Sequence, residues 1–93
     1  MAIDHLEIAR LDALLAAVGA GVDISALDGA LAQLLPGLGR RHCDASDVLE
    51  EPFRSHVSAD FHLLDTSNHC IRVTEDPAEA TALLIAAKTA QAV

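Results

Sequence analysis

The sequence predicts an α+β domain with two N-terminal helices, a small, mainly antiparallel three-stranded sheet with a hairpin at 61–73, and a C-terminal helix packed on one sheet face. Three observations predict it. Two capped stretches with helical apolar spacing precede residue 36, apolar and polar residues alternate on both sides of a turn within 61–73, and Asp76-Pro77 is a strong helix start. Because 93 residues fall below the roughly 100–150 of a typical domain, we expect a single domain over 1–93.

The two N-terminal helices are predicted from their caps. Asp4, with Glu7 three residues later, forms a capping-box pattern, and Asp23 or Ser25 is the expected N-cap of the second helix. Glycines at 19 and 21 end the first helix, and Pro36-Gly37 ends the second. The expected apolar faces are Ile8, Leu11, Leu14, Leu15 and Val18 in the first helix, and Leu27, Leu31, Leu34 and Leu35 in the second.

A short strand over 38–43 and an acidic segment over 44–51 are expected next. Asp44 or Ser46 is placed to cap a single helical turn that Pro52 ends. The segment has four acids, Asp44, Asp47, Glu50 and Glu51. Asp44, Asp47 and Glu50 resemble the oxygen ligands of a hard cation, but the glycine and the terminal glutamate of a calcium loop are missing. We therefore interpret the segment as a solvated surface loop.

The hairpin and the last helix complete the predicted order. A three-residue turn at 66–68 places Phe61 opposite Val73 and Leu63 opposite Ile71, so that these four residues form one apolar face. Asp76, Pro77 and Glu79 then predict the start of a helix that extends to Lys88. Its expected buried residues are Ala80, Leu83, Leu84 and Ala87.

Composition excludes several functional classes. The formal net charge of −8 disfavours nucleic-acid binding, because a phosphate backbone needs basic residues. No apolar run approaches the ~20 residues of a membrane span, and the acidic N-terminus does not resemble a signal peptide, so we expect a cytoplasmic protein with reduced cysteines. Its small Leu/Ala core is also compatible with a homodimer or a protein partner.

Two His-Cys dipeptides are the main functional signal. His42-Cys43 and His69-Cys70 contain both cysteines of the chain, and His62 lies between them. Imidazole and thiolate are ligands for zinc, iron and other transition metals. In the predicted hairpin, His62 and Cys70 share the face opposite Phe61, so we expect a metal site formed by Cys43, Cys70, His69, His42 and His62. The spacing matches no standard zinc motif, and cysteines that pack as small apolar residues, or a Cys43–Cys70 redox pair, remain alternatives.

Residues 42–86 also resemble a known family. The similar parts are Cys43 with the acidic stretch after it, followed by F-H-L-L-D-T-S-N-H-C-I-R-V-T-E-D-P-A-E-A-T-A-L-L-I-A. They resemble a small uncharacterised bacterial family that is associated with nitrogen-fixation gene clusters and described as a candidate metal-binding family. The resemblance implies Cys43, His69 and Cys70 as ligands, with acids such as Asp44 as further ones.

These observations lead to two functional hypotheses. The first is a small non-catalytic accessory protein that binds a transition metal, zinc or iron, or a metal cluster through Cys and His ligands. The second is a metal-free protein–protein interaction module or homodimerising domain. No nucleophile with a matching base can be named, so we do not expect an enzyme.

Overall fold

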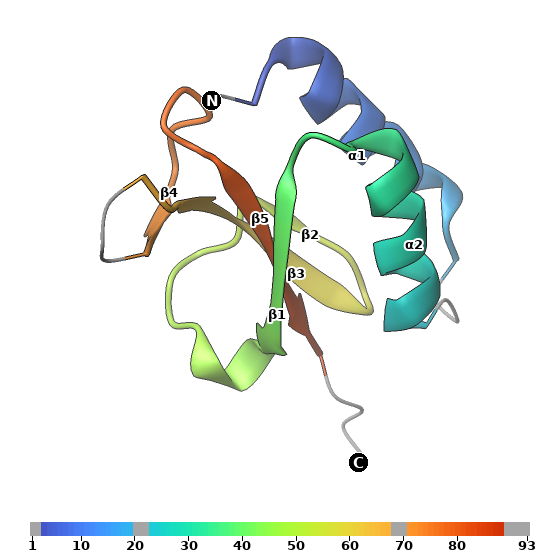
Figure 1. Ribbon diagram of the computed structural model, residues 1–93. Coiled ribbons are helices and arrows are strands. Elements are labelled where there is room, and N and C mark those ends of the chain that lie inside the picture. The colour runs from blue at the N-terminus through green and yellow to red at the C-terminus, as the bar shows by residue number, and fades with distance from the viewer. Residues whose placement is uncertain (1–2, 20–22, 68–70, 89–93) are drawn as a thin grey trace.

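The computed structural model describes residues 3–19, 23–67 and 71–88. In this part of the chain both helices come first and the strands follow, with one 3₁₀ turn after the first strand. Their bounds are α1 His5–Ala17, α2 Ile24–Leu34, β1 Gly39–Asp44, the 3₁₀ turn η1 Ala45–Asp47, β2 Arg54–Ser55, β3 Ala59–Asp65, β4 Arg72–Thr74 and β5 Ala82–Ala87. Figure 1 shows both helices on the same side of a twisted sheet.

The predicted helix starts are confirmed. Asp4 accepts a hydrogen bond from the Glu7 backbone at 2.9 Å, and the Glu7 carboxylate accepts one from the Asp4 backbone at 3.1 Å, which completes the capping box. Asp23 caps α2 through the backbone N–H groups of Ser25 and Ala26. These starts depend on residues three positions apart, so the local sequence determines them.

The predicted C-terminal helix is wrong. Asp76 caps only one turn, in which the Glu79 backbone donates to the Asp76 carbonyl at 3.0 Å. The Thr81 N–H then donates to the Leu64 carbonyl at 2.8 Å, and residues 82–87 form the strand β5. The segment Ala-Leu-Leu-Ile-Ala-Ala is apolar at every position, and such a run suits a strand that is buried on both faces as well as it suits a helix.

The predicted three-stranded, mainly antiparallel sheet is also wrong, because the sheet has five strands and is mixed. β1 pairs with β5 in parallel, and β5 pairs with β3 antiparallel. β2 and β4 both pair antiparallel with β3. The strand expected over 38–43 does exist, as β1, but its neighbour is β5.

The hairpin has a different register from the predicted one. Leu64 lies opposite Val73 and Asp65 lies opposite Arg72, whereas the sequence pattern placed Phe61 opposite Val73. The register moves by three residues, an odd number, so Val73 lies on the face of Leu64 and not on the face of Phe61. Asp65 fixes this arrangement because it accepts hydrogen bonds from Ser67 and from Arg72, both at 3.0 Å.

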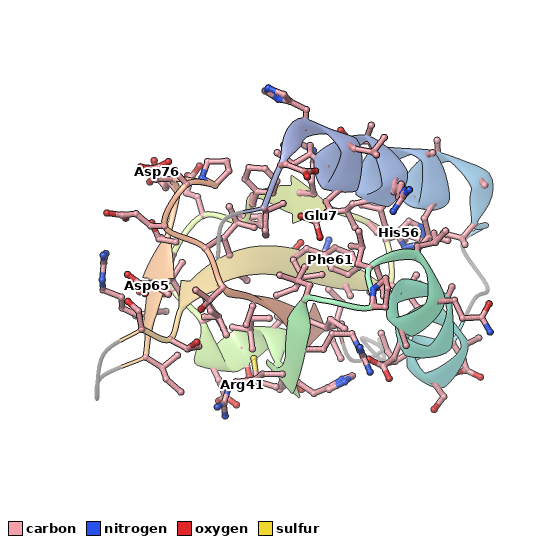
Figure 2. All side chains as sticks on the ribbon, turned by 45° about the horizontal axis from the view of Figure 1, so that its top comes forward. Glu7, Arg41, His56, Phe61, Asp65 and Asp76 are labelled. Carbon is pink, nitrogen blue, oxygen red and sulfur yellow. The ribbon has the colours of Figure 1, made fainter. Side chains whose placement is uncertain are left out.

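The two faces of the sheet differ in what covers them. Phe61 is fully buried between the sheet and the helices, and a Leu-rich cluster surrounds it. Its main members are Leu11, Leu27, Leu31, Leu35, Leu63, Leu83 and Ile85. Figure 2 shows η1 and Arg41 on the opposite side of the sheet, where strand alternation also places Cys43, His62 and Leu64.

Candidate functional site

The candidate site lies at a break in one edge of the sheet. One edge of β3 pairs with β5, and its other edge is shared by two short strands. β2 pairs with Asp60 and Phe61, whereas β4 pairs with Leu63, Leu64 and Asp65. His62 therefore lies at the point where one partner strand has ended and the other has not begun.

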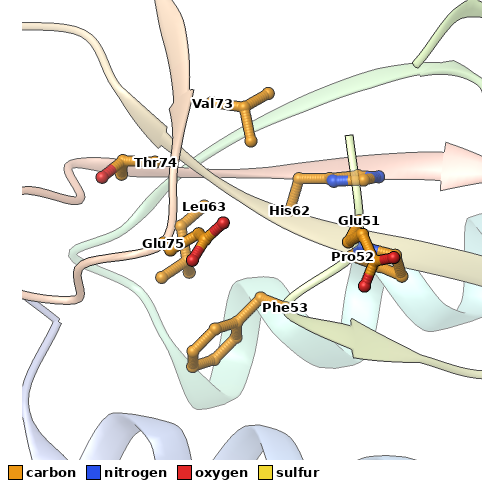
Figure 3. Close-up of a pocket in the computed structure, with 8 residues that line it drawn as sticks. All are labelled: Glu51, Pro52, Phe53, His62, Leu63, Val73, Thr74 and Glu75. Carbon is orange, nitrogen blue, oxygen red and sulfur yellow. The ribbon is translucent and has the colours of Figure 1, made fainter. Parts of the chain in front are cut away.

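A pocket of about 420 Å³ opens at this break. Figure 3 shows His62, Glu51 and Pro52 on one side of it, Thr74 and Glu75 on the other, and Phe53 at its base. Leu63 and Val73 complete the lining. Glu51 and Glu75 are exposed, and none of the eight lining residues is basic, so the lining includes two acidic side chains and no basic one.

His62 is the unusual residue of this pocket. Its side chain is buried, with 2% of the residue exposed, and Nδ1 has no hydrogen-bond partner among the described residues. An unpartnered polar atom in a buried position costs about 1–3 kcal/mol of stability. The other polar lining group in the interior, the Thr74 hydroxyl, donates to Glu79 at 2.8 Å and accepts from the Asp76 backbone at 3.2 Å. His62 is thus the buried polar group available to a ligand.

His42 lies away from this pocket. It is on the helix-facing side of β1, and its Nε2 is 3.2 Å from Asp28 Oδ1 on α2. Arg40 donates to the same Asp28 oxygen at 2.7 Å. This hydrogen bond, together with the nearby charges of Arg40 and His42, lowers the pKa of Asp28. His42 therefore takes part in a contact between β1 and α2.

Cys43 is on the same face as His62 but is not close to it. β5 separates the two strands, and Cys43 aligns through Ala86 with Asp60, two residues before His62. Strand spacing and rise place their Cα atoms about 12 Å apart, which is too far for one ion to bind both side chains. Burial and the carboxylates of Asp47 and Asp44 raise the pKa of the Cys43 thiol, which disfavours the thiolate that a metal needs.

The remaining predicted ligands, His69 and Cys70, lie outside the described residues. β3 ends at Asp65, beyond the Gly39 end of β1, whereas Cys43 is near the other end of β1. Within the described ranges 3–19, 23–67 and 71–88, no three His, Cys, Asp or Glu side chains are grouped closely enough to hold a metal ion. Of the three predicted ligands that the structure describes, His42, Cys43 and His62, it places His62 in the pocket.

The two glutamates of the pocket were not predicted as site residues. Glu51 belongs to the acidic segment that we interpreted as a solvated loop, and Glu75 follows a strand whose predicted register was wrong. The acidic composition of 44–51 was the only available signal, and it did not indicate which acid would line the pocket.

The chain was compared with known proteins. No helix in the described part of the chain is long and apolar enough to cross a membrane. No curated protein and no solved structure matches the chain. Residues 13–88, which include the end of α1, all of α2 and the whole sheet, match a family of unknown function, and the chain therefore belongs to the family DUF6129.

Proposed function

We propose that this protein is a small non-catalytic protein that binds a divalent transition metal, zinc or iron(II), in the pocket between β2 and β4. His62 is the ligand held by the fold, and the carboxylates of Glu51 and Glu75 complete the site. The observation that supports this proposal most directly is the buried Nδ1 of His62, which has no partner among the described residues.

The chemistry of the pocket suits a cation. A neutral imidazole nitrogen and carboxylate oxygens together bind zinc and iron(II). The two glutamates and the net charge of −8 attract a cation to a pocket that has no basic lining residue. A neutral ligand would gain less from these charges.

The site is assembled by the ion and is not formed in advance. His62 is fixed because it is in the middle of β3, where it pairs with Leu84 of β5. Glu51 and Glu75 are exposed and lie in connections before β2 and after β4, so their side chains can rotate toward the imidazole. Such ordering of side chains reduces affinity, and we expect binding on the order of micromolar rather than nanomolar.

The proposed ligands differ from those expected from the His-Cys dipeptides. The raised pKa of Cys43 disfavours metal binding by its thiolate, and His42 already contacts Asp28. His62 is the residue common to both ligand sets. A cytoplasmic location remains part of the proposal, because iron and zinc are both available to a cytoplasmic accessory protein. The association with nitrogen fixation, which the family resemblance implies, also remains part of it.

The test is calorimetric titration of protein purified without a histidine tag, using Zn²⁺ and, without oxygen, Fe²⁺. We expect one ion per chain. The His62→Leu variant should weaken binding by at least about tenfold, because it removes both imidazole nitrogens while keeping an apolar side chain of similar size. Glu51→Gln and Glu75→Gln should each weaken binding less.

Three control variants separate this site from the other predicted ligands. His5→Gln changes an exposed histidine on α1, and His42→Gln and Cys43→Ser change the β1 dipeptide. All three should bind as the wild type does. Absence of binding in the wild type would refute the proposal, and so would binding that Cys43→Ser abolishes and His62→Leu leaves unchanged.

A further inference from the structure

The proposed ligands leave part of the coordination sphere of a metal ion open. Among the eight residues that line the pocket, His62 offers an imidazole nitrogen, and Glu51 and Glu75 offer carboxylate oxygens. The Thr74 hydroxyl already takes part in two hydrogen bonds with neighbouring residues. Zinc with three protein ligands accepts a fourth from outside, and iron(II) with three keeps more than one open position. An ion in this pocket can therefore bind a donor that does not belong to the lining residues.

The pocket is larger than an ion and a bound water require. Its volume is about 420 Å³, whereas a water molecule takes about 30 Å³ of liquid volume. Pockets that bind small organic molecules have volumes of about 300–1,000 Å³. The pocket is open to solvent, because Glu51, Pro52 and Glu75 in its lining are exposed. A small organic molecule therefore has both the space and the access to bind beside the ion.

Apolar side chains form much of the pocket wall. Leu63 is buried, and Phe53 and Val73 are half-buried. In the view of Figure 3, Val73 lies above His62 and Leu63, and Phe53 lies below them. A ligand that the ion holds beside His62 contacts this wall, and removal of its apolar surface from water favours binding. A flat aromatic ring suits such a wall, because a rigid ligand loses little conformational freedom when it binds.

The charges of the site favour a neutral donor over an anion. A divalent ion carries two positive charges and the carboxylates of Glu51 and Glu75 carry two negative charges, so the loaded site has no net charge. An anionic ligand would add a negative charge to a protein whose net charge is already −8. A neutral ring nitrogen adds none, and nitrogen of the imidazole type is a ligand that suits both zinc and iron.

We propose, on the basis of the metal site proposed above, that the loaded pocket binds a small, neutral, aromatic nitrogen heterocycle. Its ring nitrogen takes the open position of the ion, and the rest of the ligand packs against the wall of Phe53, Leu63 and Val73. The ligand binds by coordination and packing alone, which agrees with the non-catalytic role proposed for the protein.

The test is calorimetric titration of the zinc-loaded protein with three probes, 4-phenylimidazole, imidazole and benzoate. 4-Phenylimidazole should bind at least about tenfold more tightly than imidazole, because its phenyl group is transferred from water to the apolar wall. Benzoate has the same phenyl group on an anionic donor and should bind at least about tenfold more weakly than 4-phenylimidazole. The metal-free protein should bind none of the three.

Two variants test the contact with the wall. Val73→Thr replaces a methyl group of the wall by a hydroxyl group and leaves His62, Glu51 and Glu75 in place. It should bind Zn²⁺ as the wild type does and 4-phenylimidazole at least about threefold more weakly. The matched control is Val57→Thr, which makes the same change at an exposed residue that does not line the pocket. This control should retain both affinities of the wild type.

The outcomes distinguish failure of the heterocycle site from failure of the metal site. A wild-type protein that does not bind Zn²⁺ overturns both proposals. Zn²⁺ binding that requires His62, without any binding of 4-phenylimidazole to the loaded protein, overturns only the heterocycle. The same conclusion follows if the three probes bind equally, if Val73→Thr binds 4-phenylimidazole as the wild type does, or if the probe removes the zinc, which gel filtration followed by metal analysis detects.

Discussion

The two faces of the sheet are built from different kinds of residues. The face under the helices has Phe61, Leu63, Leu83 and Ile85, all with 1% exposure or less and all apolar. The opposite face has Ala82, Ala86, Cys43 and Leu64, with His62 among them. Large apolar residues on the first face account for stability, whereas the second face includes a polar residue that packing alone does not require. The proposed ligand His62 is thus on the face that lies away from the helices.

The largest effect is expected on the helix-covered face. Phe61→Ala removes the largest fully buried side chain of the core, and the loss of transfer energy plus the cavity costs about 3–5 kcal/mol. A domain of this size has a total stability of roughly 5 kcal/mol, so the variant should be largely unfolded. Urea denaturation followed by circular dichroism measures the change. A loss under about 1 kcal/mol would mean that the helices do not pack on Phe61 as described.

For a substitution on the opposite face, we expect the free energy of unfolding to rise and not to fall. His62→Leu replaces a buried group that has an unpartnered nitrogen by an apolar one of similar size, so the free energy of unfolding should rise by about 1 kcal/mol. The same urea experiment, in metal-free buffer, provides the comparison with Phe61→Ala. A matched control is Leu64→Ala, which changes a buried apolar neighbour and should lower stability.

Together with the titration, His62→Leu gives a result that a structural histidine would not produce. If His62 has a purely structural role, its replacement lowers stability. If it is a ligand, the variant is more stable than the metal-free wild type and no longer gains stability from added metal, which for the wild type amounts to about 2.7 kcal/mol at 100 times the dissociation constant. A destabilised His62→Leu variant would count against the binding site.

Local signals in the sequence were sufficient for the helices but not for the sheet. Asp4, Glu7 and Asp23 form their caps with residues two or three positions away, so their effect is visible in the sequence itself. Residues 82–87 become a strand because β1 and β3, distant in sequence, pair on either side of them. Alanine and leucine favour a helix when isolated, and this tertiary pairing overrides the preference.

The candidate site was predictable only in part, for a similar reason. The alternation in β3 correctly placed His62 on the face opposite Phe61. Its burial and its pocket follow from the break between β2 and β4, which depends on the register of both short strands with β3. An error of three residues in one register was enough to hide Glu75 from the predicted site.

The smallest expected effect concerns the connection between the helices and the sheet edge that bears the pocket. Arg54 of β2 binds Asp12 of α1 through two hydrogen bonds of 2.6 and 3.2 Å, and its guanidinium lies 4.3 Å from the centre of the Phe53 ring. Both charged side chains are more than one third exposed, so solvent screening limits the contribution of the pair to about 0.5 kcal/mol. Asp12→Asn should lower stability at neutral pH by this amount.

The pH dependence of this pair follows from the carboxyl group. The hydrogen bond from Arg54 is the main cause that lowers the pKa of Asp12, and the Arg54 charge adds to it against the effect of burial. A lowered pKa means that the stabilisation is present above the unfolded value of about 4 and is lost as pH falls through the folded value. The stability difference between wild type and Asp12→Asn should therefore be constant from pH 7 to 5, begin to fall near pH 4 and vanish once the pH is below the lowered pKa of the folded state. It should also shrink in 1 M salt. A stability difference that persists at low pH would show that Asp12 acts by packing on α1 and not by its charge. In that case the packing of Phe53, and not the Asp12–Arg54 ion pair, would hold β2 beside the pocket.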